Sequence, residues 1–136
     1  MLFLAFRYPR RRRIIPTKER VYTEAEISEK LAKELPEWRF EGGWIRRTYK
    51  MHTWPGTILL IGTIGMLSEA AWHHPDLVVS YAFVEVKLST HSAKGITDKD
   101  FELAHKLEET LLWRGQNAPE APLAKRVLRG PKAEQE

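Results

Sequence analysis

The residues best suited to chemistry in this sequence are three histidines beside predicted element ends. His73 and His74 follow the predicted end of an apolar helix, and His91 closes a strand of alternating residues. Catalytic and binding groups are commonly displayed at such positions. Imidazole exchanges a proton near neutral pH, because its unperturbed pKa is about 6.5. The three side chains therefore indicate general acid–base chemistry.

Two carboxylates are spaced so that they could assist these histidines. Glu69 lies four residues before His73. On one helix the two share a face, so Glu69 could orient the imidazole or help to bind a substrate. Asp100 falls in the first turn of the last predicted helix, where an ionised carboxylate is favoured. Each residue alone also has a plain explanation as a surface, solvated or capping group.

A zinc site is the second chemistry to weigh, because three imidazoles can hold zinc and leave one position open. Consecutive side chains diverge in an extended chain, so His73 and His74 are poor co-ligands, and no His-x-x-x-His spacing completes the set. We therefore expect no metal. Gly56, Gly62 and Gly65 do not form a phosphate loop, since they lack the preceding strand and the following lysine.

The composition limits the remaining chemistry. The chain has 136 residues and no cysteine, which excludes a disulfide scaffold, a thiolate zinc site, an iron–sulfur cluster and a cysteine nucleophile. Its residues are 43% apolar and 29% charged, which is ordinary for a folded domain. The length suits one compact domain.

The elements that must position these residues alternate regularly along the chain. Thr23 begins a helix through a capping box with Glu26, and Pro36 closes it. Gly42 and Gly43 predict a two-residue hairpin turn. The helix that precedes His73 is apolar on a broad face, so we expect it to lie buried across a sheet. The predicted strands are 38–41, 44–51, 77–81 and 83–90, and the second and third helices are 53–72 and 97–113. This order predicts an α+β fold, a two-layer sandwich of one four-stranded antiparallel sheet with helices on one face.

The positive charge is concentrated near the two ends. The net charge is +4 for the whole chain, +6 over residues 1–20, +2 over residues 114–136 and −4 between them. We expect a basic N-terminal extension over residues 1–22, a domain over residues 23–113 and a poorly ordered tail over residues 114–136. The core lacks the basic surface of a nucleic-acid module, so we do not expect nucleic-acid binding. The arginines at 10–13 leave that binding open as a minor alternative.

The sequence also predicts no membrane segment. The longest apolar stretch, 58–67, is interrupted by Gly62, Thr63 and Gly65 and is far shorter than the ~20 residues that a bilayer requires. The apolar start is followed by its charges, which is the wrong order for a secretory signal. We expect a cytoplasmic protein, although an Arg-rich opening also fits an organelle transit peptide.

The combination of motifs is more specific than its parts. Residues 69–76 read EAAWHHPD, Tyr81 is a downstream aromatic, residues 88–91 read LSTH, and residues 95–104 read GITDKDFELA. In order and spacing this pattern resembles the pterin-4a-carbinolamine dehydratase family over roughly residues 23–112. The Arg-rich start, the long tail and the glycines at 56–65 depart from the family's usual pattern.

The resemblance implies a lyase that needs no cofactor and removes water from 4a-hydroxytetrahydropterin. It implies catalytic roles for His73, His74, His91 and Asp100, and it adds Glu69 and Thr90 to the three histidines as substrate-binding residues. It also implies a homodimer or homotetramer whose small-molecule partner is a pterin. The alternative is a non-catalytic assembly or transcription-partner protein on the same scaffold. An intact set of three histidines and Asp100 argues against that alternative, because a pure scaffold has no chemical need for all four.

Overall fold

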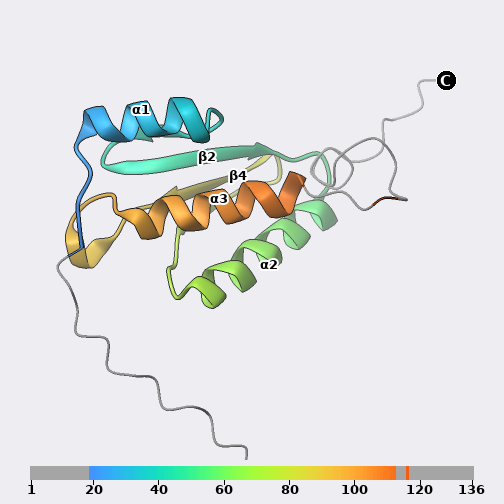
Figure 1. Ribbon diagram of the computed structural model, residues 1–136. Coiled ribbons are helices and arrows are strands. Elements are labelled where there is room, and N and C mark those ends of the chain that lie inside the picture. The colour runs from blue at the N-terminus through green and yellow to red at the C-terminus, as the bar shows by residue number, and fades with distance from the viewer. Residues whose placement is uncertain (1–18, 113–115, 117–136) are drawn as a thin grey trace, which may run out of the picture.

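One four-stranded antiparallel sheet with helices packed on it makes up the described part of the protein (Figure 1). The computed structural model describes residues 19–112 and residue 116. Its elements are α1 (Glu24–Glu34), β1 (Arg39–Glu41), β2 (Trp44–Lys50), α2 (Trp54–Ala71), β3 (Asp76–Val79), β4 (Phe83–Leu88), a short 3-10 helix η1 (His91–Ala93) and α3 (Asp98–Leu112). The sheet order is β1-β2-β4-β3 with every pair antiparallel. The predicted α+β fold and element order are therefore confirmed.

Local sequence signals account for several element boundaries. The Glu26 N–H donates to Thr23 Oγ1 at 3.3 Å, while the Thr23 N–H donates to Glu26 Oε2 at 2.8 Å, so the predicted capping box begins α1. Gly42 and Gly43 have φ of 62° and 82°, the positive values that a tight β1–β2 turn requires.

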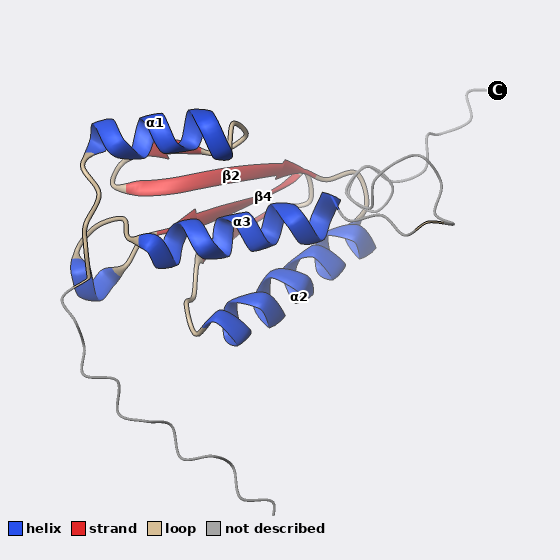
Figure 2. Ribbon diagram, viewed as in Figure 1, coloured by secondary structure: helices blue, strands red, loops and turns tan. Residues whose placement is uncertain are grey.

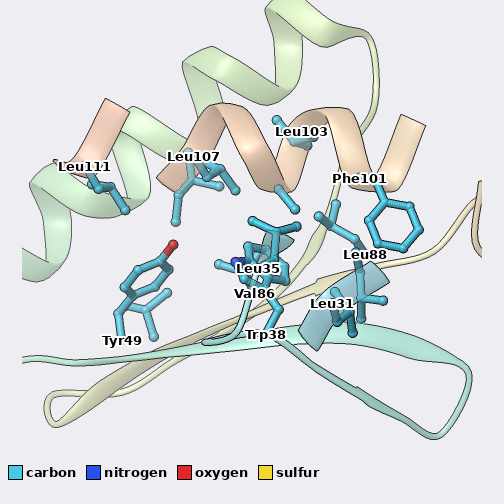
Figure 3. Close-up of a cluster of buried hydrophobic side chains, with 14 of the residues drawn as sticks. Leu31, Leu35, Trp38, Tyr49, Val86, Leu88, Phe101, Leu103, Leu107 and Leu111 are labelled. Atoms are coloured by element: carbon cyan, nitrogen blue, oxygen red, sulfur yellow. The ribbon is translucent and has the colours of Figure 1, made fainter. Parts of the chain in front are cut away.

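The core lies between the sheet and the helices that cover one of its faces (Figure 2). Ile45 of β2 pairs with Leu88 of β4, and Tyr49 pairs with Val84, and all four side chains are buried. Figure 3 shows Leu107 and Leu111 of α3 above these strands, and α1 contributes Leu31. The alternation of strand side chains thus directs every second residue into this core.

The opposite face of the sheet carries charged side chains. Arg39 of β1 and Arg46 of β2 both donate to Glu85 Oε1 of β4, at 3.0 and 3.2 Å. This polar face explains why the helices pack on the other side only.

A polar cluster lies at the edge of the core around Glu108 of α3. Its Oε1 accepts hydrogen bonds from Trp38 Nε1 at 3.0 Å, Arg47 Nε at 2.9 Å and Tyr49 Oη at 3.2 Å. Burial, together with the Glu108 charge, raises the pKa of the Tyr49 phenol, so Tyr49 remains a neutral donor. The cluster ties β2 to the C-terminal half of α3.

The expectation that the second helix is buried across the sheet was wrong. A single stripe of α2, which includes Leu60 and Ile64, packs against α3 and β4, whereas Ile58 is 52%, Leu59 55% and Met66 77% exposed. α3 occupies the central position over the sheet, so α2 lies beside α3 (Figure 1) and keeps much of its apolar surface outside the core.

The regions before and after the folded core are only partly described. Tyr22 packs edge-to-face on Phe101, with ring centroids 5.2 Å apart, and its N–H donates to the Ile96 carbonyl at 2.9 Å. The basic run at 10–13 and the tail at 117–136 lie outside the described residues. None of the helices within the described residues has the length and hydrophobicity needed to cross a bilayer.

Candidate active site

Three segments that are distant in sequence meet at one end of the molecule. The C-terminal end of α2, the 3-10 helix η1 and the N-terminal end of α3 lie together there (Figure 1). They enclose a pocket of about 240 Å³. The pocket is lined by Trp72, His73, His74, Ser89, Thr90, His91, Ser92 and Lys99. All three histidines singled out from the sequence therefore contribute to one pocket.

The end of α2 is shaped by an unusual backbone conformation at Trp72. This residue adopts the left-handed conformation, with φ of 51° and ψ of 40°. Its N–H donates to the Glu69 carbonyl, and the next N–H, that of His73, donates to the Ser68 carbonyl, both at 3.1 Å. Such a turn closes a helix and redirects the chain. His73 therefore leaves the helical path.

His73 is held by a fully buried carboxylate. Its Nε2 lies 2.6 Å from Asp100 Oδ1. A carboxylate only accepts hydrogen bonds, so with Asp100 ionised the proton of the ring resides on Nε2. Nδ1 is then the nitrogen free to exchange a proton with a ligand, which is the arrangement a general acid–base group requires.

Asp100 is itself fixed by the start of α3. Its Oδ2 accepts from the Thr97 N–H at 2.9 Å and from Thr90 Oγ1 at 2.8 Å. The Thr90 and Thr97 hydroxyls also lie 2.7 Å apart. Three hydrogen bonds and a helix N-terminus compensate for removing this charge from water. Asp100 was predicted to cap the helix and also to assist an imidazole. Its side chain does both, one through each carboxylate oxygen.

His74 diverges from His73 and pairs with the other carboxylate. Its Nε2 lies 2.8 Å from Glu69 Oε2, and both side chains are exposed. The expectation that Glu69 would face His73 was wrong. It assumed that the helix continues through residue 73, whereas the left-handed Trp72 ends the helix and places His74, not His73, over Glu69.

His91 is positioned from the sheet. Its ring packs edge-to-face on the indole of Trp44, with centroids 5.5 Å apart. The Lys87 ammonium lies 4.6 Å from the centre of the same indole. Trp44 begins β2 and Lys87 lies in β4, so the pairing of these strands places the aromatic support beside η1.

Several pocket residues were not predicted from the sequence. Trp72 and Lys99 stand directly beside predicted residues, and Ser89 and Ser92 flank His91. Trp72, Ser89 and Lys99 lie inside the quoted motifs and Ser92 directly follows one, so the motifs were the signal that could have found them. Thr90 lines the pocket, and its hydroxyl is bonded to Asp100 and Thr97. Lys99 forms an ion pair with Glu19.

Within the described part of the chain, no three His, Asp or Glu side chains gather closely enough to hold a metal ion. Instead, Asp100 and Glu69 each hold one imidazole. The arrangement offers three imidazoles, a cation at Lys99 and small hydroxyl groups to a ligand. It can therefore bind a small polar molecule and move protons to and from it.

Comparisons with known proteins identify similar sequences and a similar fold. The protein-family profile described as "Pterin 4 alpha carbinolamine dehydratase" matches residues 20–110. A Chloroflexus aurantiacus protein named "Putative pterin-4-alpha-carbinolamine dehydratase" is 42% identical over 89 residues, covering 65% of this chain and 95% of that protein. An Aquifex aeolicus protein of the same name is 41% identical over 90 residues, covering 66% of this chain and 90% of that protein.

A solved structure has a similar fold. The crystal structure of a "transcriptional coactivator/pterin dehydratase" from Brucella melitensis matches with a TM-score of 0.59 and 28% sequence identity. The match covers 65% of this chain and 96% of that one.

Proposed function

Because the chain belongs to the pterin 4 alpha carbinolamine dehydratase family, we propose that it removes water from 4a-hydroxytetrahydropterin and releases quinonoid dihydropterin. The observation that carries this proposal is the meeting of His73, His74 and His91 at one pocket, with a buried carboxylate behind His73. The products are a dihydropterin and one water molecule.

The reaction explains why imidazoles are needed. The bond between C4a and its hydroxyl breaks as the N5 lone pair forms a double bond to C4a. The leaving hydroxyl must receive a proton, and the proton on N5 must pass to a base. Imidazole can perform either transfer near neutral pH. The electrons stay within the substrate, so the dehydration needs no external oxidant or reductant.

Each histidine has a different support in this proposal. Asp100 keeps the proton of His73 on Nε2. Nδ1 is therefore the nitrogen that exchanges a proton with the substrate. Glu69 pairs with His74, and the exposed pair can bind the substrate as well as relay a proton. His91 is held against Trp44. All three histidines are assigned to catalysis and substrate binding, with Asp100 as the residue that orients His73.

The remaining pocket residues are assigned to substrate binding. Thr90 forms part of the wall and fixes Asp100 through its hydroxyl. A pocket of about 240 Å³ is slightly smaller than the ~300–1,000 Å³ that is typical of small-molecule sites. Its size suits a bicyclic heterocycle. We further propose that the protein acts as a homo-oligomer in the cytoplasm, in the recycling of tetrahydrobiopterin.

A second candidate function is an assembly or transcription-partner role on the same scaffold. It is favoured by the Brucella melitensis structure, whose title names both a transcriptional coactivator and a pterin dehydratase. The two functions make different demands on the site. A binding scaffold needs Asp100 only to cap α3, whereas proton transfer also needs its contact with the His73 imidazole.

A dehydration assay tests the proposal. The full chain is added to 4a-hydroxytetrahydropterin that a hydroxylase has just generated, and the appearance of quinonoid dihydropterin is followed by absorbance. We expect acceleration over the spontaneous reaction without added metal, and the same rate in the presence of a chelator. A rate no greater than the spontaneous one would favour the scaffold function. Loss of activity with chelator and its recovery with zinc would overturn the proposed mechanism.

A further inference from the structure

An exposed tryptophan at the edge of the pocket has no role in the proton transfers described above. Trp72 is 68% exposed although it is the largest apolar side chain that lines the pocket. Its indole packs edge-to-face on the His74 ring, with centroids 5.6 Å apart. A large apolar side chain left in water beside a group of polar residues commonly marks a binding surface.

The backbone of Trp72 adds a second, independent observation. Only two non-glycine residues among those described have positive φ, Trp72 at 51° and Lys94 at 54°. The residue that closes a helix in the left-handed conformation is usually glycine, because a Cβ is crowded there. A bulky aromatic residue in this conformation is a genuine outlier. The helix end alone would be served better by glycine, which points to a role for the indole beyond closing the helix.

From this position we infer that Trp72 is a substrate-binding residue, and that its indole forms the aromatic wall on which the conjugated, planar part of the pterin's pyrimidine ring stacks. This inference rests on the proposed function. The left-handed turn places the indole beside His74 and at the rim of the pocket that holds His73 and His91. A ring lying on Trp72 is thereby presented to the imidazoles at its C4a and N5 side.

The expected effect is on binding and not on the chemical step. When water leaves, only C4a of the pyrimidine ring changes, from tetrahedral to trigonal. The other five ring atoms stay in one conjugated plane throughout, so stacking on that plane stabilises substrate and transition state about equally. Interactions of that kind change KM and leave kcat alone. When an aromatic side chain that stacks on a heterocyclic base is truncated, the affinity for the base falls roughly 5- to 150-fold.

Two substitutions separate this role from a structural one. Trp72→Gly removes the indole and also supplies the residue that a left-handed helix end prefers. We expect its melting temperature to be equal to or above that of the unsubstituted protein. We expect KM for 4a-hydroxytetrahydropterin to rise roughly 5- to 150-fold, with kcat changed less than about threefold. Trp72→Phe retains an aromatic face and should restore KM to within a few fold of the original.

A binding measurement gives a readout that does not depend on turnover. Biopterin, an unreactive pterin, should quench tryptophan emission in the unsubstituted protein. The same quenching should survive in Trp54→Phe, which removes an indole at the other end of α2, and should fall in Trp72→Phe, where Trp44 beside His91 remains as a second indole near the pocket. Unchanged quenching in Trp72→Phe would overturn the inference.

The outcomes distinguish this inference from the proposed function. No turnover by the unsubstituted protein would refute the dehydratase activity itself. Turnover by the unsubstituted protein with an unchanged KM in Trp72→Gly would refute only the role of Trp72. A lowered melting temperature in Trp72→Gly, or dissociation of an oligomer that accounts for the rise in KM, would assign Trp72 to structure and overturn the inference.

Discussion

The imidazole of His73 and the carboxylate of Asp100 meet at 2.6 Å although 27 residues separate them in sequence. Asp100 is fully buried and accepts two further hydrogen bonds through its other oxygen. One oxygen therefore belongs to the helix start and the other to the pocket. The same side chain caps α3 and sets the tautomer of His73.

Replacing Asp100 with asparagine should separate these two roles. Asp100→Asn can still accept the Thr97 N–H through its amide oxygen, so we expect a modest fall in melting temperature. Its amide nitrogen would face His73 Nε2 and favour the other tautomer, which would lower kcat roughly 10²- to 10⁴-fold. Steady-state kinetics and thermal melts of the purified variant check this prediction. A variant with full kcat would show that His73 does not depend on Asp100 for its tautomer.

The three pocket histidines should each matter for turnover. We expect His73→Ala, His74→Ala and His91→Ala each to lower kcat/KM, with proton transfer typically accounting for roughly 10²- to 10⁴-fold. In a double variant, the loss of transition-state stabilisation should be smaller than the sum of the losses in the two single variants. The reason is that groups that act on one leaving oxygen form a unit.

His52→Ala and His105→Ala are the matched controls for this series. Neither residue lines the pocket, and His105 pairs with Glu34 on α1 instead, so their replacement should leave kcat/KM nearly unchanged. Kinetics for the five variants, beside thermal melts, decide the question. Full activity in His74→Ala, or a loss explained by unfolding alone, would refute the assignment of the site.

The protein should self-associate. α2 exposes Ile58, Leu59 and Met66, and β3 is an edge strand of the sheet. An apolar helix face and an unpaired edge are both unfavourable in a monomer. Sedimentation velocity at micromolar concentration should reveal a dimer or tetramer. Leu59→Glu should shift the population towards smaller species without loss of helical signal. A monomeric unsubstituted protein would contradict this expectation.

The contact between α1 and α3 should depend on pH through Glu34. Hydrogen bonds from Lys30 and His105, at 2.9 and 2.8 Å, lower the pKa of Glu34 below its ordinary 4.5. A carboxyl group whose pKa is lower in the folded state stabilises the fold above its unfolded pKa, and that stabilisation is lost as pH falls through the folded pKa. Glu34→Gln should therefore melt a few degrees lower at pH 7 and approach the unsubstituted protein as pH falls well below 4.5.

Calorimetry across this pH range checks the Glu34 prediction. Glu29→Gln removes another exposed carboxylate of α1 and is the control for the general effect of charge. A gap between Glu34→Gln and the unsubstituted protein that stays constant with pH would contradict the assigned linkage.

The sequence alone was sufficient to predict the helices and strands and the types of residue that make up the candidate site. Periodicity, the capping box at Thr23 and the Gly42-Gly43 turn reflect local backbone preferences, which act over a few residues and can be recognised without a structure. The three histidines, Glu69 and Asp100 were singled out because their residue types and their spacing in the motifs can be read directly from the sequence. The structure confirmed the fold and brought these residues to one end of the molecule.

Tertiary structure alone decided the pairing within the site and the exposure of α2. Whether Glu69 would meet His73 or His74 depended on a single left-handed residue, Trp72, and helical spacing cannot anticipate where a helix stops in that way. The contacts of His73 with Asp100 and of His91 with Trp44 join segments far apart in sequence. The apolar face of α2 remained exposed because α3 took the place over the sheet. Such contacts depend on how helices and strands pack together. The sequence pattern shows which face of a helix or strand is apolar, but not which other element packs against that face.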